Sequence, residues 1–441
     1  MPVWKQSRSL YARSGHELWN KGVIPFEVSS NPALARVYTH LIEAWLRDCK
    51  AKKPVVCVVE LGCGTGRFGY YMLRALEMLD VRYVMTDISP KSLEQLHSHR
   101  RLRSFERAGR LSFAALALGD PLPIPREATH TVVIANYVFD SVPADVFSAR
   151  TGVLCEWRDE DGAFTLEASR GKRYPDPLLQ RILTRFTREQ YPIFSVSALV
   201  TDFLRSLSSP TLVLASDKAF VRKDQPTREL SPFIQNHGGT ASVTVDFEVL
   251  AAVAEGLGMR ALMPRGVASF STAVLSLGPK VLTATEASFA QAFTGGGVIE
   301  GLRIWARLSA ASAGIDIQDA IALLRQSHGD PEIFARLAPN IGSLLRPEHR
   351  APLLDALRLV SKNLYFTGDP TLDPSFALGE LFLQLASPKD AERCFRDAAI
   401  NGTQRKNALE FLISCYVTLG RDDEARETEQ ALAAARLEPG T

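Results

Sequence analysis

Three glycines stand at alternate positions where a strand-like run ends and a helical pattern begins. In VVCVVELGCGTGRFGYYMLRALEML, residues 55–79, five apolar residues precede Glu60, and Gly62, Gly64 and Gly66 follow. Glycine lacks a Cβ, so the backbone can turn sharply there and approach a ligand closely. The N-terminus of the following helix would face that ligand. The pattern predicts a binding corner for a nucleotide-type ligand.

The spacing of these glycines separates two classes of ligand. Dinucleotide sites prefer G-x-G-x-x-G, with the pyrophosphate at the helix N-terminus. Here the pattern is E-x-G-x-G-x-G, so the third glycine comes one residue too early for that fingerprint. The carboxylate of Glu60 would repel a pyrophosphate, whereas it suits the ammonium group of a methionine-type moiety. The corner therefore favours a ligand that carries such a group.

Further polar residues follow the next strand-like runs. Asp87 ends the strand in RYVMTDISP about 20 residues beyond the glycines, where an acid can accept hydrogen bonds from ribose hydroxyls. Asp120, in LGDPLPIP after a third run, would lie within reach of an adenine amino group. The fourth run leads into ANYVFDSVP, so Asn136 and Tyr137 fall at the strand end beside the ligand, where acceptor groups usually sit.

These residues need a sheet that brings the strand ends together. Five short apolar runs alternate with helical patterns such as GYYMLRALEML, and the runs are VVCVVEL, RYVMTDI, LSFAALAL, HTVVIANYV and TLVLASD. Such alternation predicts an α/β fold with a mostly parallel sheet covered on both faces. Farther along, we expect a strand, a helix capped by Asp246, a strand after Gly258 and a last strand in VASFSTAVLSLG.

The character of the chain changes after Gly278, where Ala-, Leu- and Arg-rich helical patterns replace the β-rich runs. The segment TGGGVIEG, residues 294–301, is typical of a flexible joint. Asp330 and Ser387, each followed by proline, mark two helix starts. We expect four parts: an N-terminal extended and helical segment 1–54, the α/β domain 55–280, a helical linker or subdomain 281–365 and helical repeats 366–441.

The tail carries a period of 34 residues, read from three pairs of similar residues: Phe382 and Tyr416, Leu385 and Leu419, Ala391 and Ala425. Both copies have a helix–turn–helix pattern, and 34 residues is the tetratricopeptide period. The alternative is a plain pair of helical hairpins whose spacing arises by chance. Two copies are fewer than the three that such repeats need to be stable alone, so the preceding helices would supply further packing surface.

Composition narrows the function classes. The chain has 441 residues, which suggests two or three domains, and its net charge of +2 does not argue for a nucleic-acid partner. The basic stretch 97–110 is interrupted by Glu106, as in many solvated helices. The six cysteines form no C-x-x-C pair and no zinc spacing, which indicates a reduced, cytoplasmic compartment and no metal. No apolar run approaches the ~20 residues of a membrane helix, and the basic N-terminus leaves a transit peptide as the alternative.

The ordered segments resemble the motifs of class I S-adenosylmethionine-dependent methyltransferases. VVELGCGTGRFG matches the first motif, TDIS the second and LGDPLPIP the third. The resemblance implies a Rossmann-like domain with S-adenosyl-L-methionine as cofactor and no metal. The cofactor contacts that it implies are Glu60, Gly62, Cys63, Gly64, Gly66, Asp87, Ile88, Asp120 and Asn136.

Residues 20–280 also resemble, more narrowly, the MidA-type family, which includes a mitochondrial complex I assembly factor that methylates arginine in a partner protein. ANYVFDSVPADVF is similar to its Asn-Glu-Phe-Phe-Asp-Ala-Leu-Pro signature, and SVTVDFEVLAAVAEGLGMRAL to a late helix segment. Two features depart from that family. Its Gly-Pro-Gly-Arg-Gly is GCGTG here, and its signature Glu is Tyr137, so the acid that could pair with a guanidinium is missing.

These patterns lead to one function and two alternatives. We expect a methyltransferase that modifies a protein or peptide side chain held by the C-terminal repeats. The alternatives are a scaffold or assembly factor that retains the fold, and a small-molecule enzyme whose tail makes a homo-oligomer. Asp140 is the candidate for positioning or deprotonating the acceptor, with Asn136 and Tyr137 beside it. The alternative role of Asp140 is that of a turn or cap residue after the strand.

Overall fold

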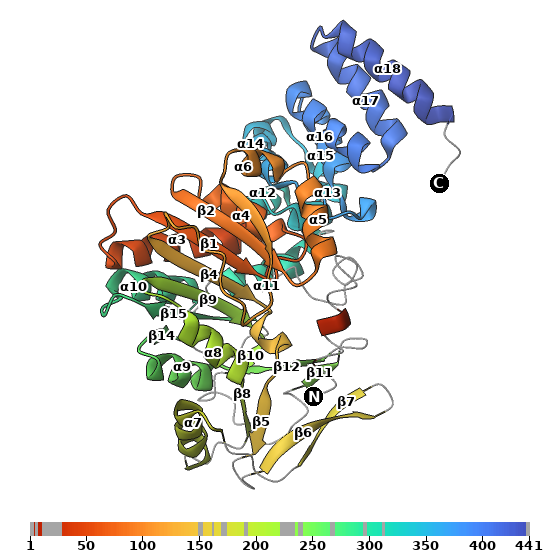
Figure 1. Ribbon diagram of the computed structural model, residues 1–441. Helices are drawn as coiled ribbons and strands as arrows, with labels where there is room; N and C mark the ends of the chain where they lie inside the picture. The colour runs from red at the N-terminus through yellow and green to blue at the C-terminus, as the bar shows by residue number, and fades with distance from the viewer. Residues whose placement is uncertain are drawn as a thin grey trace. The chain divides into compact units, whose positions relative to one another are not determined.

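The computed structural model forms two compact units, Met1–Ile299 and Glu300–Thr441 (Figure 1). The described residues are 4, 8–10, 29–148, 153–160, 163–168, 174–188, 193–220, 234–236, 241–264, 270–293, 298–310 and 314–437. The division falls in the expected joint at 294–301, of which 294–297 lie outside the described residues. No helix among the described residues is long and apolar enough to cross a membrane.

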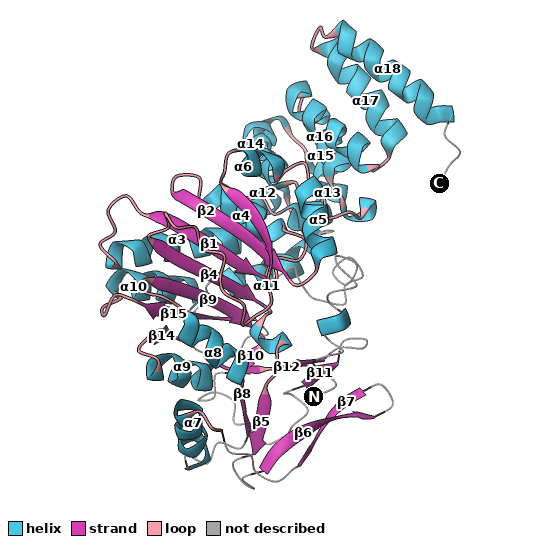
Figure 2. Cartoon of the chain, in the orientation of Figure 1, coloured by secondary structure: helices cyan, strands magenta, loops and turns pink. Residues whose placement is uncertain are grey.

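A seven-stranded sheet in the order β14-β15-β9-β4-β1-β2-β3 forms the centre of the first unit (Figure 2). Its strands are β1 (Val55–Leu61), β2 (Asp80–Asp87), β3 (Leu111–Ala115), β4 (His130–Asn136), β9 (Thr211–Asp217), β14 (Arg260–Leu262) and β15 (Ser271–Leu277). The first five are mutually parallel, and β15 runs antiparallel to both of its neighbours. The predicted, mostly parallel sheet is therefore confirmed. The expected third strand is shorter than its apolar run, because β3 ends at Ala115.

The strand order reverses at β1. The chain passes from β1 to β2 and β3 on one side, and β4 and β9 lie on the other. In open α/β sheets, ligands bind at the carboxyl ends of the strands where the order reverses. Leu61 is paired with Ala135, so the segments that follow β1 and β4 leave the sheet side by side.

Helices cover both faces of the sheet, and alternate strand residues point to each. Val59 and Leu275 belong to a core shared with α7 (Pro177–Arg188), α8 (Ala198–Ser206) and α9 (Phe247–Gly256). On the other face lie α3 (Pro32–Asp48), α4 (Arg67–Ala75) and α10 (Thr283–Phe293) (Figure 2). There the Trp45 indole donates to the Ser276 hydroxyl over 2.9 Å, which anchors α3 on β15. Two short helices, α5 (Pro90–Ser98) and α6 (Arg103–Arg107), connect β2 to β3.

A second sheet is inserted between β4 and β9. It is antiparallel, in the order β7-β6-β5-β8, and was not predicted from the sequence. Its strands are β5 (Asp145–Ser148), β6 (Val153–Glu160), β7 (Ala163–Ala168) and β8 (Ile193–Val196). The sequences of β6 and β7 mix charged with apolar residues, so they lack the continuous apolar run that marks a buried parallel strand.

Residues 241–262 follow the prediction of a strand, a helix capped by Asp246 and a strand after Gly258, whereas the pairing of short strands before that helix was not predicted. Two short strand pairs join β10 (Ala219–Phe220) to β13 (Val245–Asp246) and β11 (Ile234–Asn236) to β12 (Ala241–Val243). Asp246 caps α9 by accepting a hydrogen bond from the Val249 N–H over 3.1 Å.

The second unit is helical. Its helices are α11 (Val298–Ala310), which begins at the division, α12 (Ile317–Gln326), α13 (Pro331–Leu344), α14 (Arg350–Asn363), α15 (Ser375–Gln384), α16 (Pro388–Asn401), α17 (Arg405–Thr418) and α18 (Asp422–Leu437). Asp330 caps α13 as predicted, by accepting from the Glu332 N–H. Ser387 precedes α16, but its hydroxyl donates to Asp390 and no side-chain cap forms. Helices α15 to α18 pack in sequence, each against the next.

Candidate functional site

The segment after β1 is a tight turn built on left-handed glycines. Gly62, Gly64 and Gly66 have φ of +62°, +52° and +73°, a region that side chains disfavour. The Cys63 N–H donates to the Thr86 carbonyl over 2.8 Å, so the turn is fixed to the end of β2. Helix α4 starts directly after Gly66, with no side-chain cap at its N-terminus. We call residues 62–66 the glycine corner.

Asp87 lies beside the glycine corner at the end of β2. Its carboxylate accepts from the Gly64 N–H over 3.1 Å and from the Ser89 N–H over 2.8 Å. Burial raises the pKa of Asp87, while these bonds and one from the Ile88 N–H oppose the rise. The structure therefore brings together the glycines and the acid expected to hold a ribose. Their contact with the cofactor stays a prediction.

Glu60 lies beneath the corner, within the packing of sheet and helix. Its carboxyl accepts from the Tyr83 hydroxyl over 2.9 Å, and burial raises its pKa to about 8. A Cβ on Gly69 would stand 2.5 Å from the same carboxyl and 2.4 Å from the terminal methyl group of Met85, so glycine lets α4 pack closely on these side chains. The Glu60 carboxyl therefore lies between Tyr83 of β2 and Gly69 of α4. Its expected pairing with an ammonium group stays a prediction.

Asp120 and Cys63 lie at opposite extremes of exposure. Asp120 is exposed, and its carboxylate accepts from the Ala117 N–H over 2.8 Å in the loop after β3. The Cys63 thiol is buried within the corner, and burial raises its pKa well above the ordinary value. The corner thus offers its backbone, and not an ionised thiol, to a ligand.

Residues 136–141 form the turn after β4, which we call the acceptor-side turn. Asn136 accepts from the Tyr38 hydroxyl over 2.9 Å, and Tyr38 also bonds Ser216 on β9. Tyr137 has a left-handed φ of +54°, which is rare for a side chain of this size. Its N–H donates to the Ser216 carbonyl over 2.8 Å, and its ring lies 5.2 Å from that of Phe270.

The acceptor-side turn borders the glycine corner. A Cβ on Gly62 would lie 3.5 Å from a methyl group of Val138, an ordinary van der Waals distance. The groups expected to bind the cofactor and those expected to contact the methyl acceptor are therefore neighbours at one edge of the sheet.

Asp140 is buried in the short helix η1 (Phe139–Ser141) and lies beside a second buried acid, Asp217. The Asp140 N–H donates to Asp217 Oδ1 over 3.3 Å, and the Ser141 hydroxyl donates to Asp140 over 2.8 Å. Burial raises the pKa of Asp140 to about 6 and that of Asp217 well above its usual range. Sequence reasoning missed Asp217, although its signal, an acid that ends an apolar strand, is the one that singled out Asp87.

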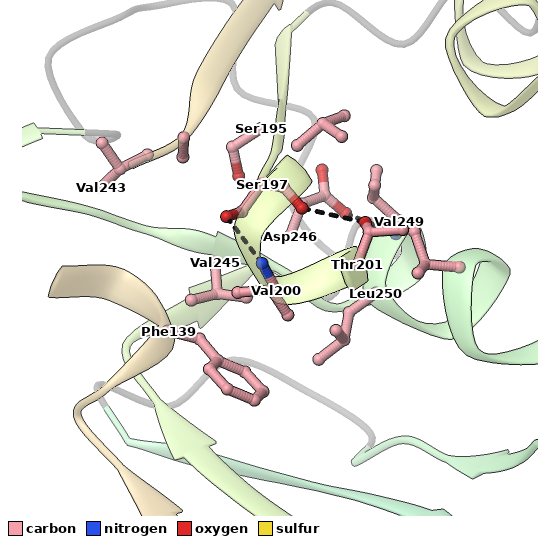
Figure 3. Close-up of a pocket in the computed structure, with 13 residues that line it drawn as sticks. Phe139, Ser195, Ser197, Val200, Thr201, Val243, Val245, Asp246, Val249 and Leu250 are labelled. Carbon is pink, nitrogen blue, oxygen red and sulfur yellow. Dashed lines mark hydrogen bonds between the residues drawn. The ribbon is translucent and has the colours of Figure 1, made fainter. Parts of the chain in front are cut away.

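A separate small cavity lies between η1, β8, α8 and α9 (Figure 3). Its volume is about 30 Å³, room for one water-sized group, and most of its lining is apolar. Two polar side chains of the lining cap helices, because Ser197 accepts from the Val200 N–H and Asp246 from the Val249 N–H. The hydroxyls of the other two, Ser195 and Thr201, donate to backbone carbonyls. The cavity contains none of the predicted site residues, so we do not assign it to the cofactor.

Comparison with known proteins gives one family match. A family model described as a methyltransferase domain matches residues 59–154, which include the glycine corner, Asp87 and the acceptor-side turn. No curated protein matches the chain.

Solved structures give low similarity. An uncharacterised protein from Burkholderia thailandensis is 18% identical, with 76% of this chain and 89% of that one covered and a TM-score of 0.43. A second member of the same superfamily from that organism, bound to S-adenosyl-homocysteine, is 17% identical, with 76% and 90% covered and a TM-score of 0.40. The family match assigns a methyltransferase domain to residues 59–154, and the geometry of the glycine corner agrees with that assignment.

Proposed function

We propose that the enzyme methylates a side chain of a protein or peptide, and that the second unit binds this partner. The observation that carries the proposal is the repeated helical pair. Helices α16 and α18 begin at Pro388 and Asp422, 34 residues apart, and Ala391 and Ala425 are buried at matching places in them. A tetratricopeptide-like array of this kind exposes an extended surface suited to a peptide or protein.

Exposed apolar side chains support a binding role for this unit. Ile400 on α16 is 60% exposed and Val417 on α17 is 59% exposed. These two side chains do not belong to the buried core that holds the helices together. Apolar surface of this kind gains free energy when a partner covers it. We place the partner's contact at these helices.

The first unit fits the cofactor through residues already described. The glycine corner gives close backbone approach, and Asp87 offers carboxylate oxygens beside it. S-adenosylmethionine supplies a methyl group on sulfonium, which an acceptor displaces in line. The protein's part is to align the acceptor with that methyl and to exclude water. In our proposal residues of the acceptor-side turn align the acceptor. The MidA-type resemblance favours a protein substrate, but Tyr137 occupies the position of the acid that could bind an arginine side chain.

The cellular compartment belongs to the same proposal. The cysteines whose side chains the structure describes, namely Cys49, Cys57, Cys63, Cys394 and Cys415, are all free thiols. Persistent free thiols suit a reducing compartment, so we place the activity in the cytoplasm.

Calorimetric titration of the full chain with S-adenosylmethionine and S-adenosylhomocysteine tests the cofactor site. We expect micromolar binding by the wild type and a loss of about a hundredfold in Gly64→Val, because a β-branched residue at φ +52° strains the corner. A folded wild-type chain that binds neither compound would contradict the enzyme assignment and favour the scaffold.

Transfer of tritiated methyl groups in an extract from cells that lack this protein tests the partner. We expect label on a discrete protein, and a drop of about tenfold in the double variant Ile400→Glu/Val417→Glu with unchanged cofactor binding. Met78→Glu is the matched control, because Met78 is an exposed apolar residue of the first unit. Label confined to small molecules would instead support the small-molecule alternative.

A further inference from the structure

Two buried acids meet next to the acceptor-side turn. Asp140 is 6% exposed in η1, and Asp217, at the end of β9, is fully buried. Asp217 accepts from the N–H of Asp140 and also from that of Phe139, so one carboxylate caps the start of η1. We call Asp140 and Asp217 the carboxyl pair.

Among the residues that the structure describes, those around the carboxyl pair provide little positive charge. In these ranges the charged group that faces the pair is Lys218, which is half-buried and follows Asp217 in the chain. The other groups that face it are the hydroxyls of Ser141 on η1 and Ser242 on β12, and the phenols of Tyr137 and Tyr38. Two ionised carboxylates in contact, with so few donors, would repel each other strongly in a buried site.

The oxygen atoms suggest how the repulsion is avoided. Asp217 Oδ1 receives the backbone N–H group of Asp140, whereas Asp217 Oδ2 is buried and receives no hydrogen bond from the described residues. One proton shared with the neighbouring carboxyl of Asp140 satisfies this atom and leaves a single negative charge in the pair. That charge is then matched by the backbone N–H groups and Lys218.

The acceptor-side turn needs contacts from the rest of the chain to keep its conformation. Tyr137 lies in the left-handed region, which costs a non-glycine residue about 1 kcal/mol or more. Surrounding contacts must therefore hold the turn, and the pair fixes its far end while Ser216 fixes Tyr137. Val138 of the turn lies beside Gly62, so a shift of the turn would also move one side of the glycine corner.

We propose that Asp217 is a positioning residue, which shares a proton with Asp140 and so holds residues 136–141 against the glycine corner. The proposal rests on the proposed function, because it assigns the acceptor side of the methyl-transfer site to this turn. It gives Asp140 the role of partner in the pair, where the sequence alone suggested a residue that positions or deprotonates the acceptor, or a turn residue after the strand.

Hydrogen exchange on the full chain tests the proposal without any substrate. Asp217→Ala removes the cap, so we expect the amides of residues 137–141 to exchange about tenfold faster, while those of β1 stay protected. In Asp217→Asn the amide accepts the same N–H groups and donates to Asp140 permanently. We therefore expect exchange within about threefold of the wild type. Asp202→Ala, which removes an exposed acid from α8, is the control.

The pH profile distinguishes a shared proton from a merely structural contact. The pair holds its proton above the ordinary pKa of an aspartate, so protection of the turn should fall as pH rises through the pKa of the pair. We expect this fall in the wild type as the pH rises above the ordinary range of an aspartate, and its absence in Asp217→Asn. If Asp217→Ala does not fold, the wild type and Asp217→Asn still decide the question.

Three results would overturn the proposal. One is a turn that stays equally protected in Asp217→Ala, and another is an Asp217→Asn variant that exchanges as fast as Asp217→Ala. The third, which needs no Asp217→Ala, is protection of the turn that depends on pH equally in the wild type and in Asp217→Asn. Titration of each variant with S-adenosylhomocysteine keeps the two claims apart. A wild type that fails to bind it contradicts the proposed function, whereas the exchange data judge the carboxyl pair by themselves.

Discussion

The glycine corner and the acceptor-side turn are neighbouring turns that reach a similar backbone geometry by different means. Both contain left-handed residues: Gly62, Gly64 and Gly66 in the first, and Tyr137 in the second. In the corner, glycine adopts this conformation without steric cost and short-range backbone bonds complete the turn. In the acceptor-side turn a tyrosine adopts it, and residues from a distant part of the chain hold it there.

The two turns therefore depend on different contacts for their rigidity. The corner depends on residue types within one short segment and on the next strand, through Asp87. The turn depends on Ser216 and Asp217 of β9, and Asp217 lies 77 positions beyond Asp140. We therefore expect the corner to be sensitive to local substitutions, and the turn to be sensitive to substitutions and charge changes on another strand.

The largest effect that we expect from this comparison concerns Asp87. Asp87→Ala removes an acceptor from the Gly64 N–H and the oxygens offered to a ribose, so affinity for S-adenosylhomocysteine should fall about a hundredfold. Calorimetry measures it. Asp80→Ala is the control, because Asp80 is an exposed acid at the other end of the same strand. Equal affinity of Asp87→Ala and the wild type would remove Asp87 from the cofactor site.

The same contrast explains how much could be predicted from the sequence. The central sheet, the glycine corner and the cap at Asp246 follow from patterns within about 20 residues, which are visible without knowing the fold. The partnership of Asp140 with Asp217 requires β4 to lie beside β9, and no local pattern contains that information. The inserted sheet was missed for a related reason, since its strands lack the apolar run by which the buried strands were recognised.

A second prediction concerns stability and the buried carboxyl of Glu60. Burial raises its pKa to about 8 in the folded chain, so the folded state keeps a proton that the unfolded state loses, and stability should decrease as pH rises from about 4.5 to about 8. In Glu60→Gln the amide keeps a hydrogen bond with Tyr83 and cannot ionise. We expect this variant to be more stable than the wild type by about 2 kcal/mol at pH 9.

Thermal unfolding of the full chain at a series of pH values measures this difference. Glu94→Gln, at an exposed position on α5, should keep the wild-type pH dependence. A wild-type profile that matches Glu60→Gln throughout would mean that the carboxyl of Glu60 titrates normally and faces solvent or a ligand.

A third prediction compares the two left-handed turns directly. Tyr137→Gly relieves about 1 kcal/mol of backbone strain but loses about 2 kcal/mol of ring burial against Phe270, for a net loss of about 1 kcal/mol. Gly62→Ala should cost about as much for the opposite reason, since its Cβ fits at 3.5 Å from Val138 and only the positive φ is unfavourable. Urea unfolding followed by tryptophan fluorescence measures both. A Tyr137→Gly variant more stable than the wild type would show that the strain exceeds the packing.

The smallest effect concerns Asp120, which sequence analysis grouped with Asp87. Asp120 is exposed, its carboxylate already accepts from Ala117, and it lies beyond the short strand β3 at the edge of the sheet. A hydrogen bond made in water contributes little net free energy, so Asp120→Ala should weaken cofactor binding only about threefold. Calorimetric titration of Asp120→Ala and Asp87→Ala with the same ligand compares the two losses of affinity directly. A loss as large as that of Asp87→Ala would mean that the loop after β3 closes over the cofactor and buries Asp120. The part of the site that changes conformation around the cofactor would then extend to the loop after β3, whereas the glycine corner is held in place by its own backbone hydrogen bonds.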